Sequence, residues 1–266
     1  HLDTYSKKYE KVNHVIEGDI IKTDGSTILG GDNKLGCSIL IGMIQNNIPG
    51  TYYFFLGEEP ILSGGVWGST KALNSNPNYF KKFKRCIAFD RKQYGSIVTR
   101  QMGRTCCSQE FAKSIATELS KKGGIKWDKK LEYGYYTDTA VFMDVIPECT
   151  NISVGYFDEH TTRESQNITF LEKLAKASIG VDWENLVIKR KIGFSDMFLS
   201  YFKDFLEDFK ACAFSMDMKL MTSYGSDYIR IEMDESDVEL VQDDLLNLSE
   251  LFNIHNMNPT LTFDDT

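Results

Sequence analysis

Apolar and polar positions along the first two thirds of the chain alternate between a strand-like and a helix-like pattern. Short apolar runs predict buried strands at 51–56, 85–90, 96–101 and 151–156. Apolar residues at helical spacing predict helices at 35–45, 64–73, 108–121 and 168–178, the third capped by Ser108. This order favours an α/β fold, which we expect to be a three-layer sandwich with a mixed, mostly parallel central sheet and helices on both faces.

The pattern and the charge both change near Lys191. Residues 191–266 hold 5 basic and 16 acidic residues, a net charge of −11, whereas residues 1–190 hold 25 basic and 22 acidic residues. Amphipathic helices are predicted at 194–209 and 238–252, with a strand at 228–233 between them. We therefore expect a domain at 1–190 and a small acidic α/β segment at 191–266 that packs on it through Phe198, Phe202 and Phe205.

Composition excludes several classes of function. The net charge of −8 disfavours nonspecific binding to nucleic acid or anionic membranes. The longest apolar run, near 39–44, is too short to cross a bilayer. The six cysteines contain no C-x-x-C pair, which excludes a cysteine zinc knuckle, and free thiols favour the cytoplasm. We expect neither a nucleic-acid nor a membrane partner.

Residues of the metal-ligand type follow several predicted strands. Glu58 and Glu59 come directly after the apolar run at 51–56, and burying two carboxylates without cations costs several kcal/mol. Asp3 shares one face of an extended chain with His1, so that it can orient this imidazole. Each motif alone is common on protein surfaces. Their placement at the carboxyl ends of strands, where open α/β sheets build their sites, favours a metal centre. The residues of this type are His1, Asp3, Asp32, Glu58, Glu59, Asp90 and His160.

As an ordered set these motifs resemble the zinc-dependent exopeptidase superfamily of bacterial leucyl aminopeptidases, tripeptidases and related carboxypeptidases. The matching segments span residues 1 to about 180 and are HLD at 1–3, LGGDNKLG at 29–36, GEE at 57–59, AFD at 88–90 and GYFDEHT at 155–161. The resemblance implies that 1–190 is a catalytic domain. It also implies a strand and helices before His1, so we expect an N-terminal part to be missing.

The resemblance further implies a site with two zinc ions, for which cobalt or manganese can substitute. Asp32 would bridge the two ions. His1 and Asp90 would complete the ligands of one ion, and Glu59 and His160 those of the other. Glu58 would be the general base, and Asp3 would orient His1. The Asp32–Asn33 peptide is expected to be cis, as in the family.

The implied activity is hydrolysis of the terminal peptide bond of short peptides, in the first place as an aminopeptidase. A carboxypeptidase or amidohydrolase on the same scaffold, and a non-catalytic metal-binding or interaction module, remain alternatives. Tyr135 and Tyr136 lie near the expected substrate rim, where they could line a side-chain pocket, stabilise an oxyanion or simply pack. Asp138 could cap a helix or help to build the site. The pattern specifies neither side-chain preference nor oligomeric state.

Overall fold

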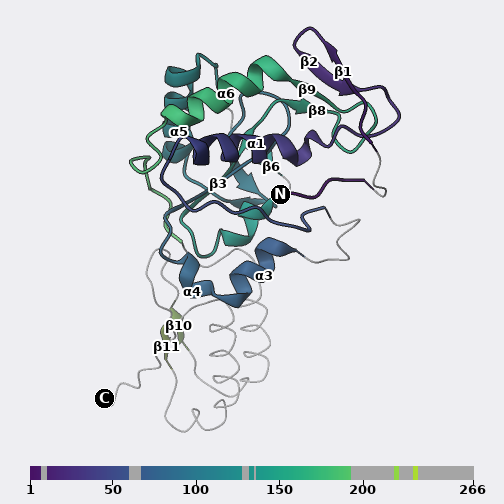
Figure 1. The fold of residues 1–266 in the computed structure, drawn as a ribbon. Coiled ribbons are helices and arrows are strands. Elements are labelled where there is room, and N and C mark those ends of the chain that lie inside the picture. Colours follow the sequence, from purple (N-terminus) through teal and green to yellow (C-terminus); the bar gives the residue numbers. More distant parts are fainter. Residues whose placement is uncertain are drawn as a thin grey trace. The chain divides into compact units, whose positions relative to one another are not determined.

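The computed structural model describes most of the first 192 residues and two short strands beyond them (Figure 1). The described ranges are 1–6, 11–59, 67–127, 132–134, 136–192, 219–221 and 230–232. The chain divides into two compact units, His1–Ile192 and Gly193–Thr266. In the second unit, β10 (Lys219–Met221) pairs antiparallel with β11 (Arg230–Glu232), which lies within the strand predicted at 228–233. The helices predicted at 194–209 and 238–252, including Phe198, Phe202 and Phe205, fall outside the described residues.

The main helices of the first unit lie where the apolar spacing predicts them. They are α1 (Gly31–Gln45), α5 (Gln109–Gly123) and α6 (Ile168–Gly180). Ser108 caps α5 as predicted, because its hydroxyl oxygen accepts the Phe111 N–H at 3.1 Å. The helix predicted at 64–73 is α3 (Gly68–Ser75), and the short α4 (Pro77–Phe80) follows it. None of the described helices is both long and apolar enough to span a bilayer.

Two parallel ladders form the centre of this unit. β3 (Arg85–Arg91) pairs with β7 (Glu148–Ser153), and β4 (Val98–Gln101) pairs with β6 (Glu132–Gly134). β4 also pairs antiparallel with β5 (Arg104–Thr105), and an isolated bridge between Ile97 and Ile152 connects this group to β7. A second, antiparallel sheet has the order β1 (His14–Glu17), β2 (Ile20–Thr23), β9 (Ser165–Asn167) and β8 (Tyr156–Phe157).

Helices pack against the central strands from different directions. α1 contacts both β3 and α6, and α6 contacts α5. α3 contacts a 3₁₀ helix, η1 (Asp138–Phe142), which in turn contacts β3 and β7. In Figure 1, α1 and α6 lie above β3, and α3 and α4 lie below it. The α/β class is therefore confirmed. The described strands form several short sheets with parallel ladders at β3–β7 and β4–β6, so the single central sheet of a three-layer sandwich stays a prediction.

The strand predicted at 51–56 is wrong: these residues are described, and none of them belongs to a strand. Their aromatic side chains pack on one another and on η1, with ring centroids 5.4 Å apart for Tyr53 and Phe55 and 6.1 Å apart for Phe55 and Phe142. The backbone accepts single hydrogen bonds, such as that from Leu2 N–H to the Phe55 carbonyl. A run of aromatic residues thus marks a buried segment without specifying a ladder.

A buried carboxylate joins the start of α5 to the end of the first unit. Glu148 is fully buried, and its oxygens accept the Ser108, Lys189 and Arg190 backbone N–H groups at 2.7–2.8 Å. The Ser108 hydroxyl also donates to Glu148 at 2.8 Å. The Ser108 hydroxyl therefore makes two hydrogen bonds. It accepts one as the cap of α5 and donates the other to the buried Glu148 carboxylate.

We expect Ser108→Ala to lower the free energy of unfolding by about 1–2 kcal/mol, because it removes the cap of α5 and leaves the Phe111 N–H without its partner. Ser114→Ala on the same helix is the control. It removes only a hydroxyl that donates to the Phe111 carbonyl, and its cost should stay within about 0.5 kcal/mol. Urea unfolding followed by circular dichroism measures both, and equal effects would contradict the capping role.

Candidate metal centre

Asp32 lies between two imidazoles that come from distant parts of the chain. Its Oδ1 is 3.2 Å from His1 Nε2, and its Oδ2 is 3.2 Å from His160 Nε2. Although burial acts in the opposite direction, these two contacts hold the pKa of Asp32 below its usual range. One carboxylate thus presents a different oxygen to each histidine, which is the arrangement expected of a bridging ligand.

The glycine-rich segment before and inside α1 brings Asp32 to the end of β3. Gly30 has a left-handed φ of 70°, which turns the chain into α1, and Asp32 keeps a non-helical ψ of 104°. The Asp32–Asn33 peptide is cis, as expected. A Cβ atom at Gly36 would lie 1.9 Å from the Phe89 carbonyl oxygen. Only glycine therefore allows α1 to approach the strand residue that precedes Asp90.

The five residues expected as ligands form two groups that share Asp32. His1, Asp32 and Asp90 form one group, and Asp32, Glu59 and His160 form the other; within each group the possible ligand atoms lie within 4.8 Å of one another. His1 Nε2 is 3.6 Å from Asp90 Oδ1, and His160 Nε2 is 2.7 Å from Glu59 Oε1. The structure thus brings together all five residues, whose role as ligands stays a prediction.

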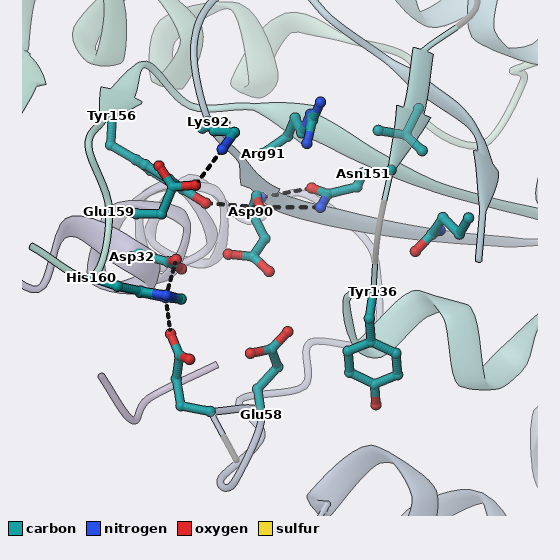
Figure 2. Close-up of a pocket in the computed structure, with 14 residues that line it drawn as sticks. Asp32, Glu58, Asp90, Arg91, Lys92, Tyr136, Asn151, Tyr156, Glu159 and His160 are labelled. Atoms are coloured by element: carbon teal, nitrogen blue, oxygen red, sulfur yellow. Dashed lines mark hydrogen bonds and ion pairs between the residues drawn. The ribbon is translucent and has the colours of Figure 1, made fainter. Parts of the chain in front are cut away.

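Asp90 is held by several bonds but keeps one carboxylate oxygen available. Its N–H donates to Asn151 Oδ1 at 2.9 Å (Figure 2). The Thr137 hydroxyl donates to Asp90 Oδ2 at 2.7 Å. Asp90 Oδ1 is buried and has no hydrogen-bond partner among the described residues. Burial, and then the charge of Asp32, raise the pKa of Asp90 to about 7. A buried carboxylate oxygen without a donor is suited to a cation.

Asp3 connects His1 to the loop that carries the two glutamates. His1 Nδ1 donates to the Asp3 carbonyl at 2.9 Å, so Nε2 is the nitrogen that faces Asp32. The Asp3 carboxylate lies 3.5 Å from the same Nδ1, and it accepts the Gly57 and Glu59 N–H groups at 3.0 and 2.9 Å. Burial raises the pKa of Asp3, but the hydrogen bond with His1, followed by that from the Glu59 N–H, lowers it to about 2. Asp3 thus contacts the expected ligand and also fixes the 57–59 loop.

Glu58 points into the cavity from this loop, towards Asp90 (Figure 2). Its Oε2 is 3.8 Å from His1 Nε2. Burial, followed by the charge of Asp90, raises the pKa of Glu58 to about 9. A raised pKa in a cavity is typical of an acid or base in catalysis, and a neighbouring cation would return the group towards its ionised form.

The carboxylates around the two histidines favour the protonated imidazoles. Hydrogen bonds to Asp32 and Glu59 raise the pKa of His160 to about 10. Hydrogen bonds with carboxylates also raise the pKa of His1 well above its usual range, although its burial acts in the opposite direction. Protons on imidazoles here balance buried negative charge. Divalent cations would fit the same nitrogen and oxygen atoms, with three protein ligands for each ion as in catalytic zinc sites.

Four of the five expected ligands border a cavity of about 220 Å³, namely Asp32, Glu59, Asp90 and His160. Tyr136 is one of its lining residues, and burial raises the pKa of this phenol to about 12. The Tyr136 ring packs edge-on against Trp67, and its hydroxyl lies 3.4 Å from Ser69 Oγ. Asp138 is buried and begins η1, for which Thr137 is the N-cap. Tyr135 lies outside the described residues.

Several residues near the site carry no sequence motif. Asn151 and Thr137 hold Asp90, and the Tyr5 ring stacks on His160 with centroids 4.3 Å apart. Glu164 accepts the Asp32 N–H at 3.0 Å. An asparagine inside the β-branched run at 151–156 was the one available signal, because a buried amide in a strand needs polar partners.

Comparison with solved structures finds similarity to several peptidases. Aminopeptidase PepT from Bacillus cereus matches with a TM-score of 0.51 and 16% identity, over 64% of this chain and 75% of that chain. The Pyrococcus horikoshii TET1 peptidase, which can assemble into a tetrahedron or a large octahedral shell, matches with a TM-score of 0.47 and 19% identity, over 65% and 53% of the two chains. An aminopeptidase from the archaeon Desulfurococcus kamchatkensis gives a TM-score of 0.43 and 12% identity, over 64% and 51%.

This chain thus spans about half the length of the two archaeal peptidases. No protein-family model and no curated protein matches the sequence. The PepT match shows a shared fold, and the resemblance to dizinc exopeptidases seen in the sequence motifs is confirmed at that level.

The pKa shifts predict how the stability of chelator-treated protein depends on pH. Asp90, Glu58 and His160 bind protons more tightly in the folded chain than in the unfolded chain. Their contribution to the free energy of unfolding is therefore complete at a pH below their ordinary pKa values of 3.8, 4.5 and 6.5. This contribution is lost as the pH rises through their pKa values in the folded chain, about 7, 9 and 10. We expect a melting temperature several degrees lower at pH 8.5 than at pH 5.5, measured by scanning fluorimetry.

Added zinc should oppose the fall in melting temperature with rising pH, because cations replace the protons and bind more tightly as the pH rises. The increase in melting temperature with zinc should therefore be larger at pH 8 than at pH 5.5. A chelator-treated protein that is more stable at pH 8.5 than at pH 5.5 would contradict these assignments.

Proposed function

We propose that the chain is a metal-dependent exopeptidase that removes single residues from short peptides, in the first place as an aminopeptidase with two zinc ions. One observation carries this proposal: the two oxygens of Asp32 face His1 and His160 separately, in two ligand groups that share this residue. A carboxylate that offers one oxygen to each of two ions could hold them about 3.5–4 Å apart, the separation typical of a two-metal hydrolytic site. The proposal includes a three-layer catalytic domain at 1–190.

Each residue of the site has a role in this proposal. Bound divalent cations would polarise the scissile carbonyl and lower the pKa of the attacking water. Glu58, at the cavity wall, accepts the proton of that water and passes it to the leaving amine. Asp3 keeps the Glu58 backbone and the His1 ring in a fixed relation. Tyr136 lies on the cavity wall, where its hydroxyl could donate to the substrate.

Charge on the Glu58 side of the cavity favours the amino end of a peptide. Asp138 is buried, and its charge contributes to the raised pKa of Glu58, so that the two carboxylates add negative potential at the same place. Two divalent ions would balance Glu58 and the three ligand carboxylates. The further negative charges of Asp3 and Asp138 would then favour the α-ammonium group of a substrate.

A carboxypeptidase is the second candidate, because Arg91 and Lys92 line the same cavity. Such cations can bind the terminal carboxylate of a peptide. Lys92, however, is paired with Glu159 at 2.6 Å, which reduces its availability for a substrate. An amidohydrolase would use the same chemistry on a non-peptide amide, and a non-catalytic module would bind metal without turnover.

We expect Glu58→Gln to lower kcat at least about 100-fold while the bound zinc remains, because the amide cannot accept the proton of water. Glu172→Gln is the control, since Glu172 is an exposed carboxylate on α6 paired with Lys176. Mass spectrometry of short peptides gives the rate, and elemental analysis gives the metal content. Full activity in Glu58→Gln would rule out this residue as the base.

Peptides that are chemically blocked at one end distinguish an aminopeptidase from a carboxypeptidase. An aminopeptidase should cleave a peptide with an amidated C-terminus at a rate close to that of the unblocked peptide. N-acetylation should reduce the rate at least about ten-fold, because it removes the ammonium group. Cleavage is followed by mass spectrometry with a chelator control. The opposite preference would establish the carboxypeptidase, and metal binding without any cleavage would favour the non-catalytic module.

A further inference from the structure

A buried glutamate that has no role in the proposed chemistry binds the backbone beside Asp32. Glu164 has an exposed fraction of 1%, and its Oε2 accepts the Gly30 N–H at 2.7 Å. Its Oε1 accepts the Asp32 N–H at 3.0 Å. The carboxylate therefore spans the turn on which the bridging residue lies, from 132 to 134 positions away in the sequence.

The local sequence supplies no cap of its own at this place. Gly30 is the N-cap residue of α1 and has no side chain that could accept the free N–H groups. A serine or aspartate at position 30 would be the usual local solution, but the left-handed φ of 70° there favours glycine. Glu164 provides the missing acceptor from a different loop.

That loop also carries His160. Glu164 follows His160 by four residues, and its N–H donates to the Thr161 carbonyl at 3.1 Å, which closes the turn between them. The Glu164 side chain therefore connects the segment of Asp32, which both ligand groups share, to the segment of His160, which belongs to one group. The packing is close, because a Cβ atom at Gly31 would lie 3.0 Å from Glu164 Oε1.

We propose that Glu164 is a positioning residue of the metal centre, which sets the distance between Asp32 and His160 through its two bonds to the backbone. This inference rests on the two-metal site of the proposed function. The ion held by Asp32, Glu59 and His160 depends on both segments that Glu164 joins. The ion held by His1, Asp32 and Asp90 depends on one of them, so the two ions should respond differently to loss of this carboxylate.

The test is a zinc titration of chelator-treated Glu164→Gln by calorimetry. The glutamine amide can accept only one of the two N–H groups and presents a donor to the other. Compared with the unaltered protein, one of the two stepwise zinc dissociation constants should rise at least about ten-fold more than the other. Unchanged constants in folded Glu164→Gln would overturn the proposal.

Glu148→Gln is a matched control for burial and for hydrogen bonding. Glu148 is as buried as Glu164 and likewise accepts backbone N–H groups at the start of a helix, but it lies outside the two ligand groups. Both variants should lower the melting temperature, whereas Glu148→Gln should leave both zinc dissociation constants within about three-fold of the unaltered protein. A similar change in zinc affinity in both variants would show that Glu164 acts through general stability, which contradicts positioning.

The variant Gly31→Ala retains Glu164 but should displace its carboxylate. This variant tests the positioning role if Glu164→Gln does not fold. The added methyl group would push on Glu164 Oε1 and on the Leu35 side chain, 2.9 Å away. We expect the same selective loss of zinc affinity to a smaller degree, and unchanged constants would overturn the proposal. Failure of the unaltered protein to bind two ions would overturn it as well. Binding of two ions without peptide cleavage would contradict only the proposed function.

Discussion

The arrangement of the first unit depends on buried negative charge around two imidazoles. Three carboxylates that are almost fully buried, those of Asp32, Glu59 and Asp90, lie within a few ångströms of His1 and His160. Such a group is unfavourable unless positive charge compensates it. Protons on the histidines, which the raised pKa values favour, would provide part of this compensation. Divalent cations would provide it more completely, which gives a physical reason to expect a metal centre at this place.

The loops that carry these carboxylates are held in a common way. In each case a polar side chain from another segment binds the backbone next to a candidate ligand. Asp3 accepts N–H groups of the 57–59 loop, Asn151 accepts the N–H of Asp90, and Glu164 accepts the N–H of Asp32. Backbone bonds fix the position of each loop and leave the ligand side chains available.

The resemblance of the motifs predicts much of the site, because HLD, GGD, GEE, AFD and DEH each contain a ligand-type residue. Asp32 with its cis peptide and the proximity of His1 to Asp90 follow from these motifs. Helices α1, α5 and α6 followed from apolar spacing. The roles of these residues as ligands remain predictions.

Other features could not be anticipated, since they depend on partners distant in the sequence. The aromatic run at 51–56 resembled a strand, but its side chains pack without a ladder. The mostly exposed strand β1 and the half-buried strand β2 show no clear alternation of burial, and local propensity does not identify them. Glu164 and Asn151 act through bonds to residues 61 to 134 positions away, which periodicity cannot reveal.

Anomalous diffraction from zinc-loaded crystals tests most directly whether Asp32 bridges two metal ions. We expect two peaks about 3.5–4 Å apart, each about 2.0–2.2 Å from a different oxygen of Asp32. His1 and Asp90 should complete one site, and Glu59 and His160 the other. A single ion, or two ions that do not share Asp32, would contradict this bridging role.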